Sequence, residues 1–166
     1  MTSLDNFDLQ SLLATAKQRG CKMAVLEVSS HGLEQSRFEG IKFDFAVLTN
    51  ITQDHLDYHG NMENYAEAKK KLFKYVLQNG KENKYAAICV DDRYGRKRFE
   101  EMAFDKKVSF SLQASSVLKA THIEEGLEGT YFEFSYLGQK YSGTTQLIGS
   151  YNIANILAAL AVSSEI

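Results

Sequence analysis

DFAVLTNITQDH, residues 44–55, decides the fold, because a short apolar run over 44–49 passes directly into a polar cluster. The same pattern occurs earlier, where KMAVLEV (residues 22–28) is followed by the polar residues 29–32. An apolar run of this length, bounded by polar residues, predicts a buried strand of a parallel sheet. Ligands bind beyond the carboxyl ends of such strands. We therefore expect both polar clusters to lie at the binding edge of one sheet.

Outward from these runs, helix-type and strand-type patterns alternate along the chain. Apolar residues at helical spacing predict helices over residues 8–19, 62–78 and 92–102. A third buried strand is expected at residues 85–90. This alternation favours an α/β sheet with right-handed crossovers.

The second half of the chain has a different composition, which is rich in β-branched and aromatic residues. It predicts strands over residues 106–111, 117–123, 130–137 and 139–147, with a hairpin turn at 137–140. A last helix is expected to begin near Ser150. The expected fold is therefore α/β, a mostly parallel sheet flanked by helices with an added antiparallel β patch.

Composition narrows the class of protein. The 166 residues suit one domain, and a hydrophobic content of 44% allows a substantial core. The formal net charge of −2 gives no general reason to expect nucleic-acid binding. No apolar run approaches the roughly 18 residues that a membrane span needs, and the start does not read as a signal peptide. Cys21 and Cys89 lie in apolar runs and are expected to be reduced core thiols, with a disulfide or a catalytic thiol as the alternatives. A cytoplasmic protein without a membrane or nucleic-acid partner is expected.

Two places carry candidate metal ligands. Glu27 ends an apolar run, where a carboxylate either holds a Mg²⁺ ion near nucleotide phosphates or caps the following turn. Residues 54–59, Asp-His-Leu-Asp-Tyr-His, hold four potential ligands within six residues. The spacing of His55 and His59 suits zinc, but on a loop it guarantees no shared face, so a polar surface loop is the alternative.

A run of three lysines offers a further candidate. A helix turns by about 100° per residue, so Lys69, Lys70 and Lys71 cannot share one environment. Lys69 lies beside the apolar stripe, whereas Lys70 and Lys71 are expected on a solvated face. Neither a G-x-x-x-x-G-K-[ST] nor a G-x-G-x-x-G motif occurs. The residues alone therefore predict an edge suited to a divalent metal, without a phosphate loop.

Three blocks of the chain resemble the Mur ligases, and most closely their MurE type. Residues 27–37 resemble the EVSSHGL-x-Q-x-R segment, residues 49–69 the TN…DHLDYHG…ME-x-Y-x-x-AK segment, and residues 149–159 the G-x-[FY]-N-x-x-N-x-x-A-A segment. Their order and rough spacing fit, and the resemblance covers essentially the whole chain. It implies a P-loop-NTPase-like central domain of a cytoplasmic ligase of bacterial peptidoglycan synthesis.

The resemblance also implies a reaction. MurE-type ligases add the third amino acid to UDP-N-acetylmuramoyl-L-alanyl-D-glutamate, with ATP activating the terminal carboxylate as an acyl phosphate. Two Mg²⁺ ions offset the charge where carboxylate and γ-phosphate meet. The implied partners are small molecules, namely this UDP-linked dipeptide, a diamino acid and ATP, and the protein is expected to be a monomer. Whether the diamino acid is meso-diaminopimelate or L-lysine stays open.

Residue by residue, the resemblance implies a catalytic and metal-binding set of Glu27, His55 and Lys69. Glu27 matches a ligand of the first Mg²⁺ and His55 a ligand of the second. Lys69 matches a lysine that CO₂ converts to a carbamate, which replaces a cation with an anion. The implied contacts to the UDP-muramoyl substrate are Thr2, Ser3, Ser29, Gln35 and Arg37, and those near the adenine are Asn152 and Asn155.

The resemblance also implies what is missing. Residues 1–166 match a central ATP-binding domain truncated before its phosphate loop, without the N-terminal UDP-binding and C-terminal domains. The family often has Asn where Met1 stands, before its Thr-Thr pair. We expect the isolated chain to bind ATP weakly and to make no product. The alternatives are a stand-alone metal- or nucleotide-binding module and a zinc hydrolase using His55 and His59.

Overall fold

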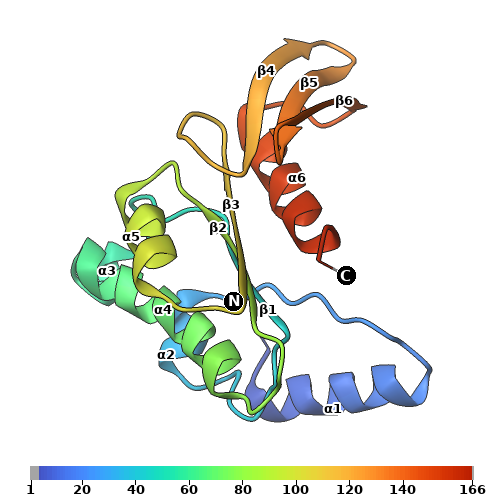
Figure 1. Ribbon diagram of the computed structural model, residues 1–166. Helices are drawn as coiled ribbons and strands as arrows, with labels where there is room; N and C mark the ends of the chain where they lie inside the picture. The colour runs from blue at the N-terminus through green and yellow to red at the C-terminus, as the bar shows by residue number, and fades with distance from the viewer. Residues whose placement is uncertain (1–3, 166) are drawn as a thin grey trace. The chain divides into compact units, whose positions relative to one another are not determined.

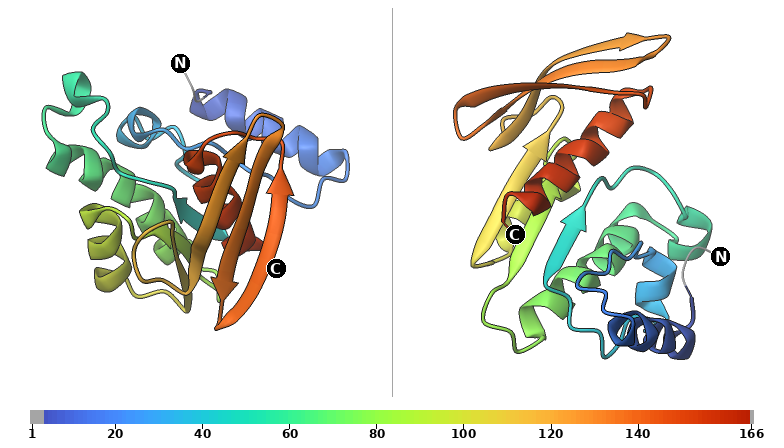
Figure 2. Two further views of the ribbon diagram at one scale, coloured as in Figure 1. Left: turned by 90° about the horizontal axis from the view of Figure 1, so that it is seen from above. Right: turned by 90° about the vertical axis from the view of Figure 1, so that its right-hand side faces the viewer.

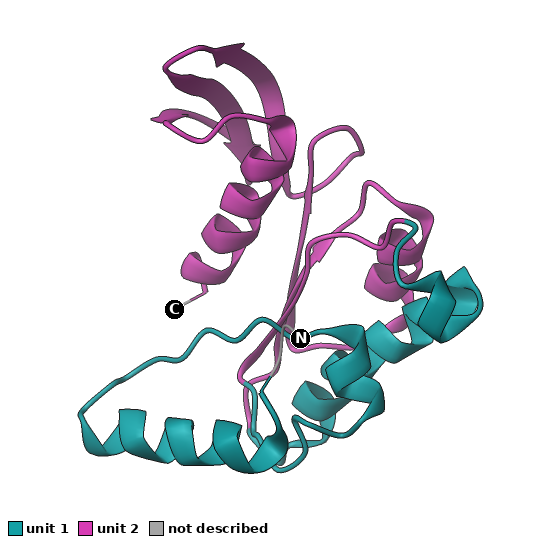
Figure 3. Ribbon diagram, turned by 180° about the vertical axis from the view of Figure 1, so that it is seen from behind, with its two compact units in different colours: residues 1–43, 53–81 teal, residues 44–52, 82–166 magenta. Residues whose placement is uncertain are grey.

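The structure is a computed structural model that describes residues 4–165. Its helices and strands are labelled in Figure 1 and seen from two further sides in Figure 2. The chain divides into two compact units (Figure 3). Unit 1 holds residues 1–43 and 53–81, and unit 2 holds residues 44–52 and 82–166. The expected Thr2 and Ser3 contacts lie outside the described residues.

Unit 1 is helical. Its elements are α1 (Asn6–Gln18), α2 (Ser30–Glu34), α3 (Leu56–His59) and α4 (Met62–Gln78). The bounds of α4 are those that the apolar spacing predicts. Side chains cap the helices, since Asp5 accepts from the backbone N–H of Asp8 and Asn61 from that of Asn64. The predicted helix at 8–19 is confirmed as α1, shifted by two residues at its start and by one at its end.

A small apolar cluster holds unit 1 together. Leu9 of α1, Leu33 of α2 and Phe38 are 4%, 2% and 1% exposed. Leu72 and Tyr75 of α4 pack against them. Gly32 is required by close packing, because a Cβ there would lie 2.7 Å from the Phe38 ring. The cluster therefore joins α1, α2 and α4 and fixes the segment that follows Glu27.

The expected strand at residues 22–28 is wrong. This segment has no strand assignment, and Val25 and Met23 are 88% and 62% exposed. Leu26 and Val28 do pack against the apolar cluster of unit 1, so alternate residues face inward. Apolar composition is not enough to make a strand, because a strand also needs hydrogen-bonded neighbours. Cys21, expected in the core, is exposed for the same reason.

Unit 2 is one six-stranded sheet in the order β1 to β6. Its strands are β1 (Phe45–Leu48), β2 (Tyr85–Cys89), β3 (Lys106–Ser111), β4 (Leu118–Gly126), β5 (Gly129–Tyr136) and β6 (Gln139–Thr145). Pairs from β1 to β4 are parallel, and β4, β5 and β6 pair antiparallel. The mostly parallel sheet with an antiparallel patch is confirmed. The patch begins at β4, however, because β3 continues the parallel ladder on β2.

Two helices accompany the sheet, α5 (Arg93–Glu101) and α6 (Ser150–Ser163). The core of unit 2 forms where α6 packs on the sheet (Figure 2), with Phe110, Ile153 and Leu157 all 0% exposed. Cys89 is buried in this core as expected, and burial raises the pKa of its thiol to about 11. No helix in residues 4–165 has both the length and the apolar character needed to cross a membrane.

Candidate functional site

Five rings from unit 1 lie close together at α3. We call them the aromatic cluster; its members are His31 of α2, His55 at the start of α3, Tyr58 and His59 of α3, and Tyr65 of α4. The ring centroid of His31 lies 4.9 Å from that of His55, 4.1 Å from Tyr58 and 5.5 Å from His59. The second polar segment expected at the binding edge thus packs against the residues that follow Glu27.

His55 is held in an uncommon backbone conformation. Its φ of 52° and ψ of 28° lie in the left-handed region, which non-glycine residues seldom adopt. Asp54 flanks it, accepting from the His55 backbone N–H at 2.8 Å and lying 3.4 Å from the ring Nε2. The imidazole is 45% exposed, so it is open to a ligand. Backbone strain of this kind concentrates at functional sites.

The three consecutive lysines, residues 69–71, have different neighbours, as the rotation of about 100° per helical residue predicts. Lys69 places its Nζ 5.1 Å from the centroid of the Tyr65 ring, and that ring also lies 6.2 Å from the His55 ring. Lys71 pairs with Glu34 at 2.7 Å and Lys70 with Glu67 at 3.9 Å. Both are half-buried rather than fully solvated. Tyr65, 4% exposed, therefore brings Lys69 and His55 onto one aromatic ring.

Glu27 is exposed, as His55 is, and lies on the segment that has no strand. Within residues 4–165, no group of three His, Cys, Asp or Glu side chains forms a metal site. The His55 and His59 pair does not suit zinc either, since His59 is 8% exposed and its Nε2 lies 2.9 Å from Ser30 Oγ. Within the described residues, His55 is therefore a single metal-ligating side chain open to solvent, and the protein does not surround the metal position with ligands.

Three residues expected to contact the substrate lie at or just beyond the ends of α2. Ser29 caps this helix, accepting from the Gly32 backbone N–H at 3.1 Å, and Gln35 ends it with an exposed side chain. Arg37 is half-buried. The backbone around it is fixed by Asn6, whose amide donates to the carbonyls of Arg37 and Glu39 at 3.0 Å each. The three residues therefore lie on one well-anchored segment.

The two asparagines expected near adenine lie on α6 of unit 2. Asn152 is half-buried and donates to the carbonyl of Ile148 at 2.9 Å, which ties the start of α6 to the preceding loop. Asn155 is exposed. Gly149 adopts a φ of 105°, and a Cβ there would lie 2.5 Å from the Tyr151 ring. Of the two asparagines, Asn155 is thus the one whose side chain is open to a ligand.

Comparison with known families identifies the chain. A family model described as the Mur ligase middle domain matches residues 1–163. The chain belongs to this family. A solved structure of a UDP-N-acetylmuramoyl-L-alanyl-D-glutamate–2,6-diaminopimelate ligase superposes with a TM-score of 0.86 and 32% identity, over 99% of this chain and 34% of that one. MurF ligase from Thermotoga maritima, solved with ADP, shares the fold with a TM-score of 0.66 at 21% identity, over 83% of this chain and 30% of that one.

Curated relatives of this Mur ligase middle domain carry MurE-type names. The diaminopimelate ligase of Synechococcus elongatus is 40% identical over 93% of this chain and 30% of its own length. The L-lysine ligase of Staphylococcus haemolyticus is 33% identical over 96% of this chain and 32% of its own length. The chain thus spans about a third of these relatives, and relatives with either amino acid in their name match it.

Part of the aromatic cluster of this Mur ligase domain, with its neighbour Ser30, is not predicted by the sequence. Ser30, His31 and Tyr58 lie inside the recognised segments but receive no role there. Tyr65 reads from its spacing as a core residue of α4, and it is indeed buried. Its second role, as the shared ring of Lys69 and His55, depends on contacts that no local pattern encodes.

The buried imidazole of His59 predicts a pH dependence of stability. Burial, aided by the neighbouring His31, lowers the pKa of His59 from its usual 6.5. The unfolded chain then binds the proton more tightly, so the contribution of His59 is fully present above about pH 6.5 and is lost as the pH falls through the folded pKa. We expect urea unfolding between pH 8 and 5 to show this loss in the native chain and a smaller one in His59→Gln. Exposed His122 is the control, and an equal pH dependence in His59→Gln and His122→Gln would contradict the assignment.

Proposed function

We propose that this chain is the middle domain of a MurE-type ligase, which adds a diamino acid to UDP-N-acetylmuramoyl-L-alanyl-D-glutamate in the bacterial cytoplasm. The observation that carries the proposal is the shared Tyr65 ring, whose centroid lies 5.1 Å from Lys69 Nζ and 6.2 Å from the centroid of the His55 ring. These are the residues to which the resemblance assigns the carbamate and a Mg²⁺ ligand. The MurE-type names of the relatives support the same reaction.

The proposed reaction forms an amide bond in two steps. A carboxylate oxygen of the dipeptide attacks the γ-phosphorus of ATP, and ADP leaves. The amine of the diamino acid then attacks the acyl carbon, phosphate leaves, and the amine loses a proton. The first step brings together two anions, so it requires positive charge at the point where they meet.

Mg²⁺ supplies that charge when it is bound. The residues fit this ion because Mg²⁺ keeps several waters and is bound through one or two carboxylates together with substrate phosphates, and the Asp54 carboxylate lies 3.4 Å from the His55 ring. His55, open to solvent beside Asp54, offers such a partial donor set. Glu27, exposed on its segment, is proposed to hold a second ion.

Lys69 is proposed to act as a carbamate. The ammonium group first loses one proton to give the neutral amine; the Nζ then forms a bond to the carbon of CO₂ and loses a second proton to solvent, so that a cation becomes an anion. This anion would serve the metal site, whereas an ammonium group would repel the metal.

Ser29, Gln35 and Arg37 are proposed to bind the UDP-muramoyl substrate. Asn152 and Asn155 are proposed to lie near the adenine, Asn152 by holding the start of α6 and Asn155 by direct contact.

The ligase proposal predicts a stoichiometric reaction. The full-length protein that carries this chain is mixed with the UDP-linked dipeptide, ATP and Mg²⁺, and meso-diaminopimelate and L-lysine are offered separately. We expect one of the two amino acids to be joined in an amide, detected by mass spectrometry, with one ADP released per amide. Release of no ADP and no product with either amino acid, from protein that is folded, would instead favour a binding module without ligase activity.

A further inference from the structure

Two adjacent residues of α2 contact both ends of α3. Ser30 shares a hydrogen bond of 2.9 Å with Nε2 of His59, the last residue of α3. His31 lies edge-on to the ring of His55, which precedes α3, with centroids 4.9 Å apart. The His31 ring also lies 4.1 Å from that of Tyr58. The sequence separation between Ser30 and His59 is 29 residues, so this contact is tertiary and not a helix cap.

The hydrogen bond is well protected. Ser30 is 2% exposed and His59 is 8% exposed. Buried polar groups in folded proteins nearly always have a hydrogen-bond partner, because an unpaired one is costly. Asn64 strengthens the same end of α3 by donating to the His59 carbonyl at 3.0 Å. The C-terminal end of α3 is therefore fixed in position.

This short helix needs such support. It has four residues, and a helix of that length is not stable by itself. His55, at its start, has a left-handed backbone with no side-chain cap. The conformation of His55 therefore depends on tertiary contacts, and the contacts of α2 act on it from both ends of α3.

We propose that Ser30 and His31 are positioning residues that clamp α3 and so set the orientation of His55 toward its metal ion. The proposal rests on the proposed function, which makes His55 a metal ligand. Residues that orient a ligand without touching the metal commonly change metal affinity or activity by about 10- to 100-fold when they are replaced. Loss of the clamp should therefore weaken metal binding, whereas affinity for the UDP-muramoyl substrate should change little.

The test uses the full-length protein with Mn²⁺ as the probe, titrated by electron paramagnetic resonance in the presence of ADP. We expect Ser30→Ala and His59→Phe each to raise the Mn²⁺ dissociation constant by roughly tenfold. In turnover assays the Mg²⁺ concentration for half-maximal rate should rise similarly, while the KM for the UDP-linked dipeptide stays within about twofold. His59→Gln, whose amide can replace the Nε2 hydrogen bond, should recover most of the lost affinity.

Thr15→Ala is the control, because it also removes a hydroxyl hydrogen bond, to the Ser11 carbonyl, at an exposed position of α1. It should leave the Mn²⁺ constant unchanged. Should Ser30→Ala fail to fold, His31→Ala against His31→Phe keeps the test decisive, since the phenyl ring retains the packing on Tyr58 and His55. Native Mn²⁺ affinity in folded Ser30→Ala or His31→Ala would overturn the clamp. So would an equal rise in the dipeptide KM. If the unaltered protein makes no amide, the proposed function fails, but the Mn²⁺ titration still reports on the clamp.

Discussion

Replacing Lys69 with alanine is expected to lower the kcat of the full-length ligase by about 10²–10³-fold, the range found when a preorganised charge-stabilising group is removed. The Nζ of Lys69 lies 5.1 Å from the centroid of the Tyr65 ring, which the ring of the proposed metal ligand His55 also approaches. The fold should persist, because the buried face of α4 is formed by Tyr65, Ala66, Ala68, Phe73 and Val76.

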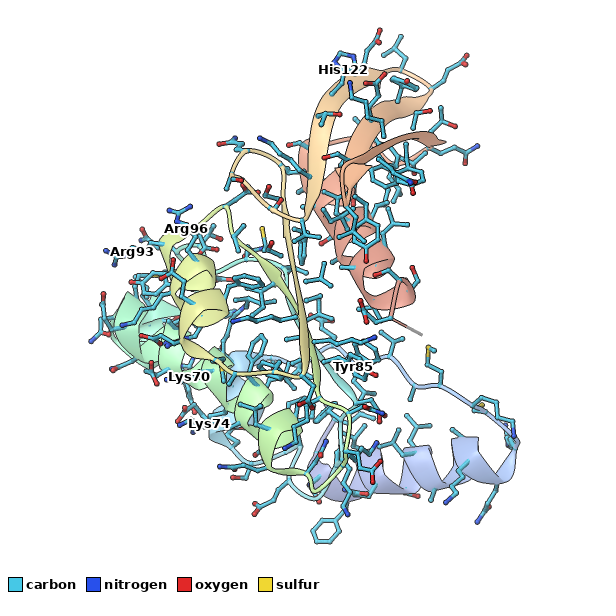
Figure 4. All side chains as sticks on the ribbon, in the orientation of Figure 1. Lys70, Lys74, Tyr85, Arg93, Arg96 and His122 are labelled. Atoms are coloured by element: carbon cyan, nitrogen blue, oxygen red, sulfur yellow. The ribbon has the colours of Figure 1, made fainter. Side chains whose placement is uncertain are left out.

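The measurement combines steady-state turnover with a test of the carbamate itself. A short-chain carboxylic acid should partly restore the rate of Lys69→Ala, because it supplies the missing anion. In the unaltered ligase with Mg²⁺ and substrates, ¹³C-labelled CO₂ should give a carbamate signal that Lys69→Ala lacks. Lys74→Ala is the control on the same helix (Figure 4), since Lys74 is exposed, and it should keep near-normal turnover. Near-normal turnover of Lys69→Ala would contradict the proposed role of Lys69 as a carbamate at the metal site.

Local patterns in the sequence were sufficient for elements that depend on local interactions. The bounds of α4 follow from apolar spacing, and the Asn61 side chain that caps it is visible in the sequence. The hairpin turn predicted at 137–140 joins β5 to β6. Leu137 and Gly138 both take a positive φ there, as a two-residue hairpin turn requires. For this helix and this turn, residues close together in the sequence determine the local structure.

Non-local pairing explains what could not be predicted. Residues 22–28 have the composition of a strand, yet strand formation depends on a neighbouring strand and not on composition. The parallel placement of β3 on β2 likewise depends on a partner about twenty residues away, with Tyr85 opposite Lys106. The bond between Ser30 and His59 belongs to the same class. The family resemblance supplied candidate residues, but the contacts that orient them came from the three-dimensional structure.

Arg37 is the other position at which a large effect is expected. Its guanidinium can bind a carboxylate or phosphate through two parallel hydrogen bonds, and its half-buried position would shield such a pair from water. Main-chain hydrogen bonds hold this position, since the Arg37 N–H donates to the Gly32 carbonyl at 2.9 Å and its carbonyl accepts from Asn6 at 3.0 Å. Arg37→Ala should therefore remove the proposed substrate contact while the main chain around it keeps its hydrogen bonds.

We expect Arg37→Ala to weaken binding of the UDP-linked dipeptide by about 2–4 kcal/mol, or roughly 30- to 1,000-fold. The Kd from calorimetry and the KM should rise together, whereas the KM for ATP and for the diamino acid should stay near the native values. Arg37→Lys should recover only part of the affinity, because an ammonium group cannot make the paired contact. Arg19→Ala, at the exposed end of α1, is the control for loss of one positive charge. An unchanged dipeptide Kd in Arg37→Ala would place the substrate elsewhere, and an equal loss in Arg19→Ala would reduce the effect to net charge.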